Sequence, residues 1–204
     1  MGSATIHLND DEFREHVERN RDIPSRDLRF RPNLSRLLDP TACKQLDADL
    51  YPCGSAWERL VAAEGIESQI PKERGLYMFV WIPKLPLKCT GSGVMEQGMP
   101  WVLYVGKAGV KGGTSDTLRN RFNDYKKHIG KSPASVWSTD SADLTREERL
   151  ATYLTLRPLE YWYIRIGDAE LIDSIEKRLR YFLRPPINTQ TEPSMRLTAT
   201  GPAF

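Results

Sequence analysis

The sequence has no long hydrophobic run and few cysteines. No stretch of 18 or more apolar residues occurs among its 204 residues, which excludes a membrane-spanning helix. The N-terminal segment 1–13 is polar and acidic and has no apolar signal-peptide core, so we expect a cytoplasmic protein. Cys43, Cys53 and Cys89 lack CxxC spacing, a pattern that favours reduced thiols over a zinc site or a disulfide framework.

Internal repeats, low-complexity segments and a large net charge are also missing. A chain of 204 residues that is 40% hydrophobic and 27% charged can build one globular domain with an extension. The net charge is only +2, but residues 118–131 contain five Lys and Arg against one Asp, and residues 177–184 contain four without an acid. A solvated helix face explains most single runs of this kind, whereas two such runs favour contacts to a nucleic-acid backbone.

Residues 1–73 are predicted to form an N-terminal extension that is helical and irregular. Short helices are expected near residues 10–19, 41–50 and 55–64, the last because Trp57, Leu60 and Val61 recur at helical spacing. The extension could complete the core, contact DNA or form a dimer interface, and the sequence does not separate these roles. The polar residues 191–204 predict a loose C-terminal tail.

Residues 74–190 predict a small α/β (α+β) domain. Aromatic and β-branched runs indicate three strands, at 75–82, 101–106 and 159–167, in a mainly antiparallel sheet flanked by helices. The connection 83–100 contains three prolines and three glycines, and we expect it to contact DNA or a partner subunit. Helices are expected at 117–129, capped by Thr114, Ser115 or Asp116; at 144–154, with a Thr145–Glu148 capping box; and at 168–183, ended by Pro185 and Pro186.

Two tripeptides stand in the first two predicted strands, Gly75-Leu76-Tyr77 and Tyr104-Val105-Gly106. Each combines a tyrosine with a glycine, where the backbone can bend or be approached closely. They are followed in order by Arg121 on a basic helix, Glu176 on a second helix and Asn188 beyond the end of that helix. This ordered set resembles the GIY-YIG nuclease superfamily, whose members cut phosphodiester bonds in DNA.

Glu176 is the candidate metal ligand. A carboxylate at the edge of an apolar helix stripe needs a partner if it is buried, and a divalent cation supplies one. Mg²⁺ uses few protein carboxylates and several waters, and Mn²⁺ can substitute for it. A surface ion pair with Arg180 at i+4 is the alternative. In the resembling family, an asparagine at the distance of Asn188 steadies the site through hydrogen bonds.

Arg121 is the candidate phosphate-binding residue, because its planar guanidinium matches two phosphate oxygens and stays charged. Tyr125 and His128 fall on the same helix face, whereas Arg119 points elsewhere. The Arg-x3-Tyr spacing is similar to the incision subunit of bacterial nucleotide-excision repair, and other family members carry histidine where Tyr125 stands. Lys107 resembles the basic residue that many relatives place after the second tripeptide.

Tyr77 and Tyr104 would be the mechanistic centre. A tyrosine with its usual pKa of about 10 is a poor base at neutral pH, but Lys107, Arg121 and a metal ion would stabilise its phenolate. The resemblance assigns Tyr77 to the general base, directly or through a relay, and Tyr104 to positioning. Two strand tyrosines that only fill a core are the ordinary structural explanation.

The resemblance implies a Mg²⁺-dependent endodeoxyribonuclease, most like the stand-alone restriction enzymes of the superfamily. Such enzymes act on double-stranded DNA, usually as homodimers, since palindromic sites have two-fold symmetry. A structure-specific repair or recombination nuclease and a catalytically silent DNA-binding module are the alternatives. The side chains expected to contact DNA are Lys84, Lys88, Arg119, Lys126, Lys127, His128 and Lys131.

Overall fold

Four strands form one antiparallel sheet in the order β1-β4-β2-β3. They are β1 (Glu58–Val61), β2 (Gly75–Trp81), β3 (Trp101–Ala108) and β4 (Leu159–Arg165). The computed structural model describes residue 18 and residues 34–53, 56–83, 100–110, 116–129, 131 and 145–188. The α/β class and the antiparallel pairing expected from the sequence are confirmed.

Several predictions concern segments outside the described residues. These segments are most of the helix expected near 10–19, most of the 83–100 connection with Lys84 and Lys88, the candidate caps Thr114 and Ser115, and the tail 191–204. The expectations about them stay predictions.

The predicted three-stranded sheet is wrong by one strand, because residues 58–61 form β1 and not the expected helix. β1 pairs antiparallel with β4, which places Leu60 opposite Tyr161. The spacing of Trp57, Leu60 and Val61 fits a helix, but these side chains do not share one buried face. Leu60 and Trp57 pack against different cores, and Val61 is 66% exposed. Pairing with the backbone groups at the edge of β4 outweighs the local periodicity.

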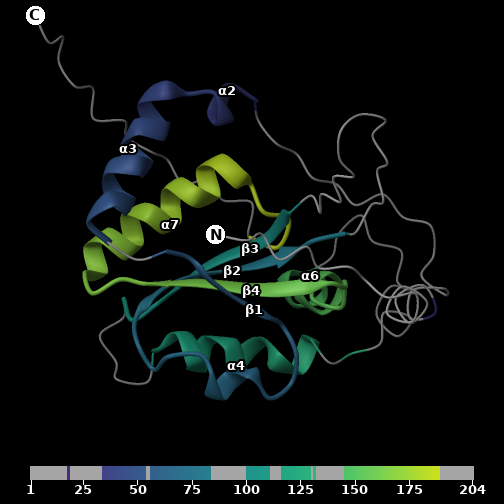
Figure 1. The fold of residues 1–204 in the computed structure, drawn as a ribbon. Coiled ribbons are helices and arrows are strands. Elements are labelled where there is room, and N and C mark those ends of the chain that lie inside the picture. The colour runs from purple at the N-terminus through teal and green to yellow at the C-terminus, as the bar shows by residue number, and fades with distance from the viewer. Residues whose placement is uncertain are drawn as a thin grey trace, which may run out of the picture.

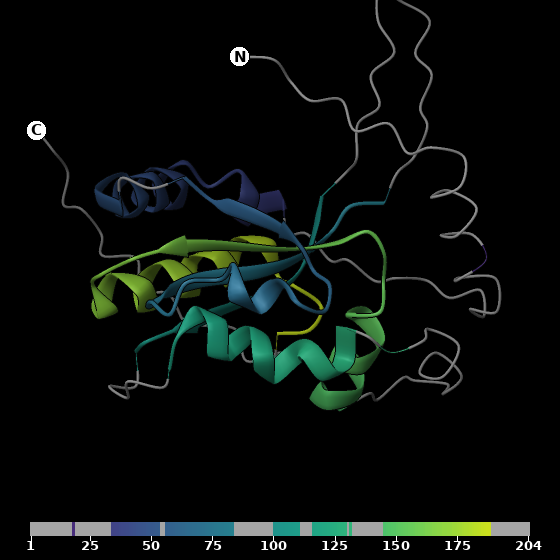
Figure 2. The ribbon, with the colours of Figure 1, turned by 60° about the horizontal axis from the view of Figure 1, so that its bottom comes forward.

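Helices cover both faces of the sheet (Figure 1). On one side lie α2 (Leu34–Leu37), α3 (Pro40–Leu50) and α7 (Ala169–Leu183), and on the other α4 (Leu118–Ile129) and α6 (Arg146–Tyr153). The short 3-10 helices are η1 (Tyr51–Cys53) and η2 (Ile66–Ser68). Figure 2 shows α6 packed beside the end of α4. None of the described helices is long and apolar enough to cross a membrane.

Side chains at the helix starts explain where these helices begin. The Asp39 carboxylate accepts backbone hydrogen bonds at the start of α3, and Asp168 does the same at α7. The predicted capping box of Thr145 and Glu148 opens α6. At α4, Thr117 Oγ1 accepts the Asn120 N–H over 3.3 Å. The capping residue is therefore Thr117, one position after Asp116, the last of the three caps that the sequence suggested.

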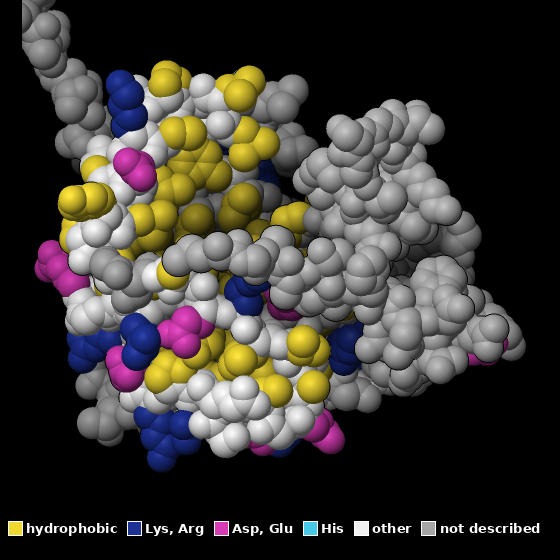
Figure 3. All heavy atoms as spheres, viewed as in Figure 1, with side chains coloured by type: hydrophobic (Ala, Val, Ile, Leu, Met, Phe, Trp, Pro, Cys, Tyr) yellow, Lys and Arg dark blue, Asp and Glu magenta, His cyan; other side chains and the backbone are white. Residues whose placement is uncertain are grey.

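The side chains of β2 alternate between two cores. Tyr77 and Phe79 pack on the α4 side, whereas Leu76, Met78 and Val80 pack on the α7 side. The α7-side core has partly buried hydrophobic side chains around it, and Figure 3 shows hydrophobic side chains gathered over α3 and α7. This alternation decides on which side of the sheet each candidate residue lies.

The described part of the N-terminal extension packs on the same sheet. It contributes the strand β1, and Ile66 and Ile70 are buried in the α4-side core. The helix α3 packs against α7, where Arg178 Nε lies 2.6 Å from Asp49 Oδ2. Residues 34–53 and 56–73 therefore help to build the fold that carries the candidate site.

Candidate active site

Tyr77, Tyr104 and Tyr125 come together on the α4 side of the sheet. Tyr77 lies in β2 and Tyr104 in the adjacent β3, and Tyr125 lies on the face of α4 that packs against them. The ring of Tyr77 covers Gly106, its cross-strand partner. A Cβ atom added at Gly106 would lie 2.5 Å from the Tyr77 hydroxyl oxygen, so this ring position requires glycine.

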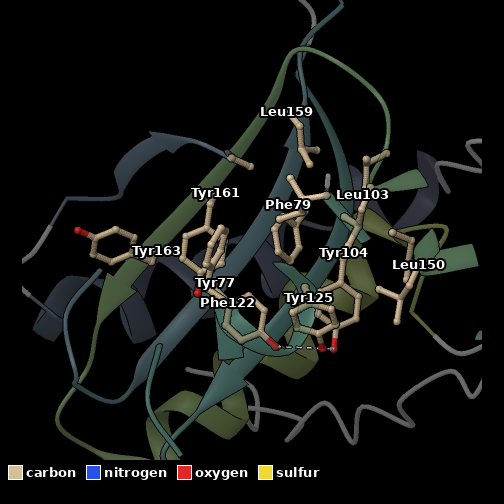
Figure 4. Close-up of a cluster of buried hydrophobic side chains, with 14 of the residues drawn as sticks. Tyr77, Phe79, Leu103, Tyr104, Phe122, Tyr125, Leu150, Leu159, Tyr161 and Tyr163 are labelled. Atoms are coloured by element: carbon tan, nitrogen blue, oxygen red, sulfur yellow. Dashed lines mark hydrogen bonds between the residues drawn. The ribbon is translucent and has the colours of Figure 1, made fainter. Parts of the chain in front are cut away.

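The three hydroxyl groups form one hydrogen-bonded chain (Figure 4). Tyr77 donates to Tyr125 over 3.3 Å, and Tyr125 donates to Tyr104 over 3.1 Å. Arg146, from α6, donates through Nη2 to the same Tyr104 oxygen over 3.2 Å. The Tyr104 oxygen therefore accepts two hydrogen bonds at the end of the chain, and one of them comes from a charged donor.

Arg121 lies beside the hydrogen-bonded tyrosine hydroxyls and is held by carboxylates. Its Nε is 2.7 Å from Asp116 Oδ1, and its Nη1 is 3.7 Å from Asp124 Oδ2. Burial lowers the pKa of Arg121, but the hydrogen bond to Asp116 and the electrostatic influence of Tyr77 and Tyr125 outweigh burial and raise it. Arg121 is thus a firmly charged group next to the tyrosine hydroxyls.

An open pocket of about 460 Å³ lies at the start of α4. Its lining consists of Asp116, Asn120, Arg121, Asn123 and Asp124. Asp116, one of the expected helix caps, binds the Arg121 side chain instead. A phosphate that enters this pocket meets a guanidinium whose Nε is already bonded to Asp116.

The surroundings of Tyr77 oppose the ionisation that the sequence led us to expect. Tyr77 is 1% exposed, and burial, reinforced by the neighbouring tyrosines, raises its pKa well above the usual value of about 10. Burial likewise raises the pKa of Tyr125 to about 12. Lys107, which was expected to stabilise the Tyr77 phenolate, lies on the other side of the sheet.

Lys107 and Glu176 meet on the α7 side. Lys107 stands opposite Leu76, whose side chain belongs to the α7-side core. Its Nζ lies 3.5 Å from Glu176 Oε2 and forms a closer ion pair with Asp173. Glu176 is 5% exposed, and its Oε1 lies 3.2 Å from Arg180 Nη1. The i+4 pair considered as the alternative to a metal ligand is therefore present.

Glu176 offers a divalent cation a single carboxylate. Its two oxygens face Lys107 and Arg180, so a cation would have to displace at least one of these partners to bind this buried group. Mg²⁺ commonly takes one or two carboxylates and several waters. Within the described ranges, no group of three or more His, Cys, Asp or Glu side chains is placed to hold a metal ion. Water or substrate oxygens would have to complete the coordination.

Asn188 pairs with the edge strand β3. Its Oδ1 accepts the Val105 N–H over 2.9 Å, and its Nδ2 donates to the Val105 carbonyl over 2.8 Å. The N–H of the preceding Ile187 donates to the Leu103 carbonyl over 3.1 Å. The segment after α7 thus fixes the outer edge of β3 at Leu103 and Val105, on either side of Tyr104. These contacts give a physical basis to the expectation that Asn188 steadies the site.

The candidate residues therefore form two groups that share β3. Successive side chains of a strand point to opposite faces, so Tyr104 faces α4 and Lys107 faces α7. The first group contains the tyrosines, Arg121 and Arg146, and the second contains Lys107 and Glu176. A substrate that touches both groups has to reach around the edge strand β3.

Two of the predicted DNA-binding residues on α4, Arg119 and His128, are poorly placed to contact DNA. Arg119 donates through Nε to the Ile70 carbonyl over 2.7 Å and through Nη2 to the Ser68 carbonyl over 3.1 Å. These bonds tie α4 to the segment that precedes β2. His128 is 3% exposed, and burial lowers its pKa. Arg119 is thus engaged with the backbone of the preceding segment, and His128 is buried.

The lysines of α4 lie nearer the surface. Lys126 Nζ is 2.5 Å from Glu67 Oε1, and Lys127 Nζ is 3.2 Å from Glu147 Oε1. Lys131, just beyond the helix, is exposed. Of the described candidates for DNA contact, these three lysines are the better placed.

Sequence reasoning missed Arg146 and Asp173. Arg146 follows the capping residue Thr145 directly, which marks a helix start but says nothing about Tyr104, 42 residues earlier. Only the docking of α6 brings the two together. Asp173 had a usable signal, since it precedes Glu176 by three residues and so shares a helix face with it.

Comparison with known proteins gave no relative: no family model matches the chain, and neither a curated protein nor a solved structure matches it. The functional argument therefore depends on the geometry of the chain's own residues.

Proposed function

We propose that this chain is an endonuclease that hydrolyses phosphodiester bonds in double-stranded DNA. The observation that carries the proposal is the hydrogen-bonded chain from Tyr77 through Tyr125 to Tyr104, with Arg146 at its end. Buried tyrosine hydroxyls find hydrogen-bond partners in any core, but a core does not require a charged guanidinium at the end of the row. The resemblance of the ordered motif residues to GIY-YIG nucleases supports the same activity.

Tyr104 is the proposed proton acceptor for the attacking water, in place of Tyr77. Burial holds the pKa of Tyr77 well above its usual value, and the hydroxyl of Tyr77 is used to donate to Tyr125. Tyr104 is the terminal acceptor of the hydrogen-bonded row, so its own proton is not donated within the row. Tyr104 would first release that proton to solvent, and the resulting phenolate would take the proton of the attacking water. Arg121 would stabilise the negative charge that develops on the phosphoryl oxygens.

Glu176 is the proposed ligand of Mg²⁺, with Mn²⁺ as a substitute. When bound, the cation would polarise the phosphate and lower the pKa of a coordinated water. Without it, Lys107 and Arg180 balance the charge of Glu176. If the cation displaces Lys107 from Glu176, the ion pair with Asp173 would still hold Lys107 at the site.

A restriction-type enzyme that acts as a homodimer is the finer proposal. It is supported by the resemblance of the ordered motif residues to stand-alone restriction enzymes. Two-fold symmetric sites are read most simply by two copies of one chain. A structure-specific repair or recombination nuclease is the competing proposal, and a silent DNA-binding module is the third.

Incubation of supercoiled plasmid DNA with the protein and Mg²⁺, followed by sequencing of the ends, tests these proposals. Discrete fragments with a common terminal sequence would support restriction, and preference for branched or damaged DNA would support repair. The variant Glu176→Gln is the control, since it removes one carboxylate charge and little volume. If plasmid is bound but left intact by the wild type, the chain is a DNA-binding module and not a nuclease.

A further inference from the structure

Arg146 is held at the end of the tyrosine chain by two contacts. Its Nη2 donates to the Tyr104 hydroxyl over 3.2 Å, and its Cζ lies 5.8 Å from the centre of the Tyr104 ring. Arg146 is exposed and stands at the first position of α6, directly after the capping residue Thr145. The guanidinium is therefore fixed on one side by Tyr104 and open to solvent on the other.

The charge of Arg146 is not balanced by a neighbouring carboxylate in the part of the chain that the structure describes. Glu147 pairs with Lys127, and Glu148 is used in the capping box with Thr145. The described partners of Arg146 are the phenol groups of Tyr104 and Tyr125 and not carboxylates. Phenols can orient a guanidinium but do not neutralise it.

Arg121 differs from Arg146 in this respect. Asp116 lies 2.7 Å from Arg121 and Asp124 lies 3.7 Å away, so two carboxylates surround its charge. The two arginines both influence Tyr125 electrostatically, which places them around the same phenol cluster. Of these two guanidinium groups, the one without a carboxylate partner among the described residues is that of Arg146.

We infer that Arg146 binds a phosphate oxygen of the DNA backbone beside Tyr104. This inference rests on the proposed function and adds a phosphate contact that the motif pattern does not contain. A guanidinium has five N–H donors in a planar fork, so donors remain for phosphate oxygens after the bond to Tyr104. The contact with Tyr104 fixes the fork in advance, which reduces the entropy lost when the phosphate binds. Arg146 would thus bring the phosphodiester to the proposed proton acceptor.

The test is the salt dependence of DNA binding by Arg146→Gln. Glutamine keeps an N–H donor for Tyr104 but removes the charge. Affinity for a fluorescent DNA duplex is measured by anisotropy in EDTA, which prevents metal-dependent cutting, over a series of KCl concentrations. Each phosphate neutralised on duplex DNA contributes about 0.9 to the slope of log affinity against log salt. We expect Arg146→Gln to lower the slope by about 0.9, and Arg146→Lys to retain it.

Arg59→Gln is the matched control. Arg59 also stacks on an aromatic ring, with its Cζ 5.5 Å from the centre of Trp162, but on the α7 side of the sheet. Its loss removes the same charge without touching the tyrosine chain, and the slope should stay at the wild-type value. A wild-type slope in Arg146→Gln, or equal losses in both glutamine variants, would overturn the inference while leaving the proposed nuclease intact.

Two further results test other reasons for a changed slope. One is a folding defect in Arg146→Gln, and the other is an error in the proposed DNA-binding function itself. If Arg146→Gln unfolds at a lower temperature than the wild type, Arg146→Lys and its slope decide, because lysine restores the charge but not the planar fork. If the slope of log affinity against log salt in Arg146→Lys is as low as in Arg146→Gln, the result would count against a contact that depends on the charge. Failure of the wild-type protein to bind duplex DNA at any salt concentration would overturn the proposed function and this inference together.

Discussion

Removal of the Tyr125 hydroxyl should destabilise the protein more than removal of the Tyr77 hydroxyl. In Tyr125→Phe, the hydroxyl of Tyr77, which is 1% exposed, loses the hydrogen-bond acceptor that the structure gives it. A buried polar group without a partner costs about 1–3 kcal/mol. Tyr104 keeps its bond from Arg146, so most of the loss comes from Tyr77. The free energy of unfolding should therefore fall by about 1–3 kcal/mol.

Removal of the Tyr77 hydroxyl, by contrast, leaves no buried hydroxyl without a partner. In Tyr77→Phe, Tyr125 still donates to Tyr104, so only one hydrogen bond is lost, worth about 0.5–1.5 kcal/mol. In the double variant, Tyr77 has no hydroxyl left to satisfy. The double variant should thus lose less stability than the sum of the two single variants, by about 1 kcal/mol.

Urea unfolding of the four proteins at one temperature gives the required free energies. Tyr51→Phe is the control, because Tyr51 is 87% exposed and the change should alter stability by less than about 0.5 kcal/mol. Additive losses in the double variant, or a Tyr125→Phe variant as stable as Tyr51→Phe, would show that the three hydroxyl groups are not linked. The structural basis of the proposed active site would then be lost.

Three other outcomes follow from the same structure. Glu176→Gln should abolish Mg²⁺-dependent cleavage but leave duplex binding in EDTA near the wild-type level; cleavage at the wild-type rate would remove Glu176 as the ligand. Arg121→Ala should lower the cleavage rate by about 10²–10³, whereas Arg119→Ala should mainly lower the melting temperature, because Arg119 bonds two backbone carbonyls; equal effects on rate would contradict this division. Burial lowers the pKa of His128 in the fold, so below the unfolded value of about 6.5 the unfolded chain binds more protons and stability falls as the pH drops; in His128→Gln the urea midpoint should change less between about pH 7.5 and pH 5.5, and an unchanged difference would refute the assignment.

The sequence alone determined most of the elements from residue 74 onward. The strands at 75–81, 101–108 and 159–165 and the helices at 118–129, 146–153 and 169–183 lie within about three residues of the predicted ranges. Local signals suffice there, because aromatic and β-branched runs, a Thr145–Glu148 capping box and a proline pair act over a few residues. The class of fold could be predicted for the same reason.

Residues 58–61 show where local signals fail. Their spacing fits a helix, yet the strand β1 forms because β4, about a hundred residues later, offers an unpaired edge. A single sequence contains no local trace of such a pairing. The same limit explains why Arg146 was not recognised, since its contact with Tyr104 exists only after α6 docks against α4.

The candidate site divides in the same way. Chain order, residue type and the family resemblance indicated that Tyr77, Tyr104 and Arg121 belong together, and the structure places the two tyrosines in one core. Alternation along a strand already separates Lys107 from Tyr104, a consequence that sequence reasoning missed, and only the tertiary structure decided that Lys107 meets Glu176 there. It also decided the direction of the Tyr77 pKa shift, because burial depends on what packs around a side chain and not on its neighbours in sequence.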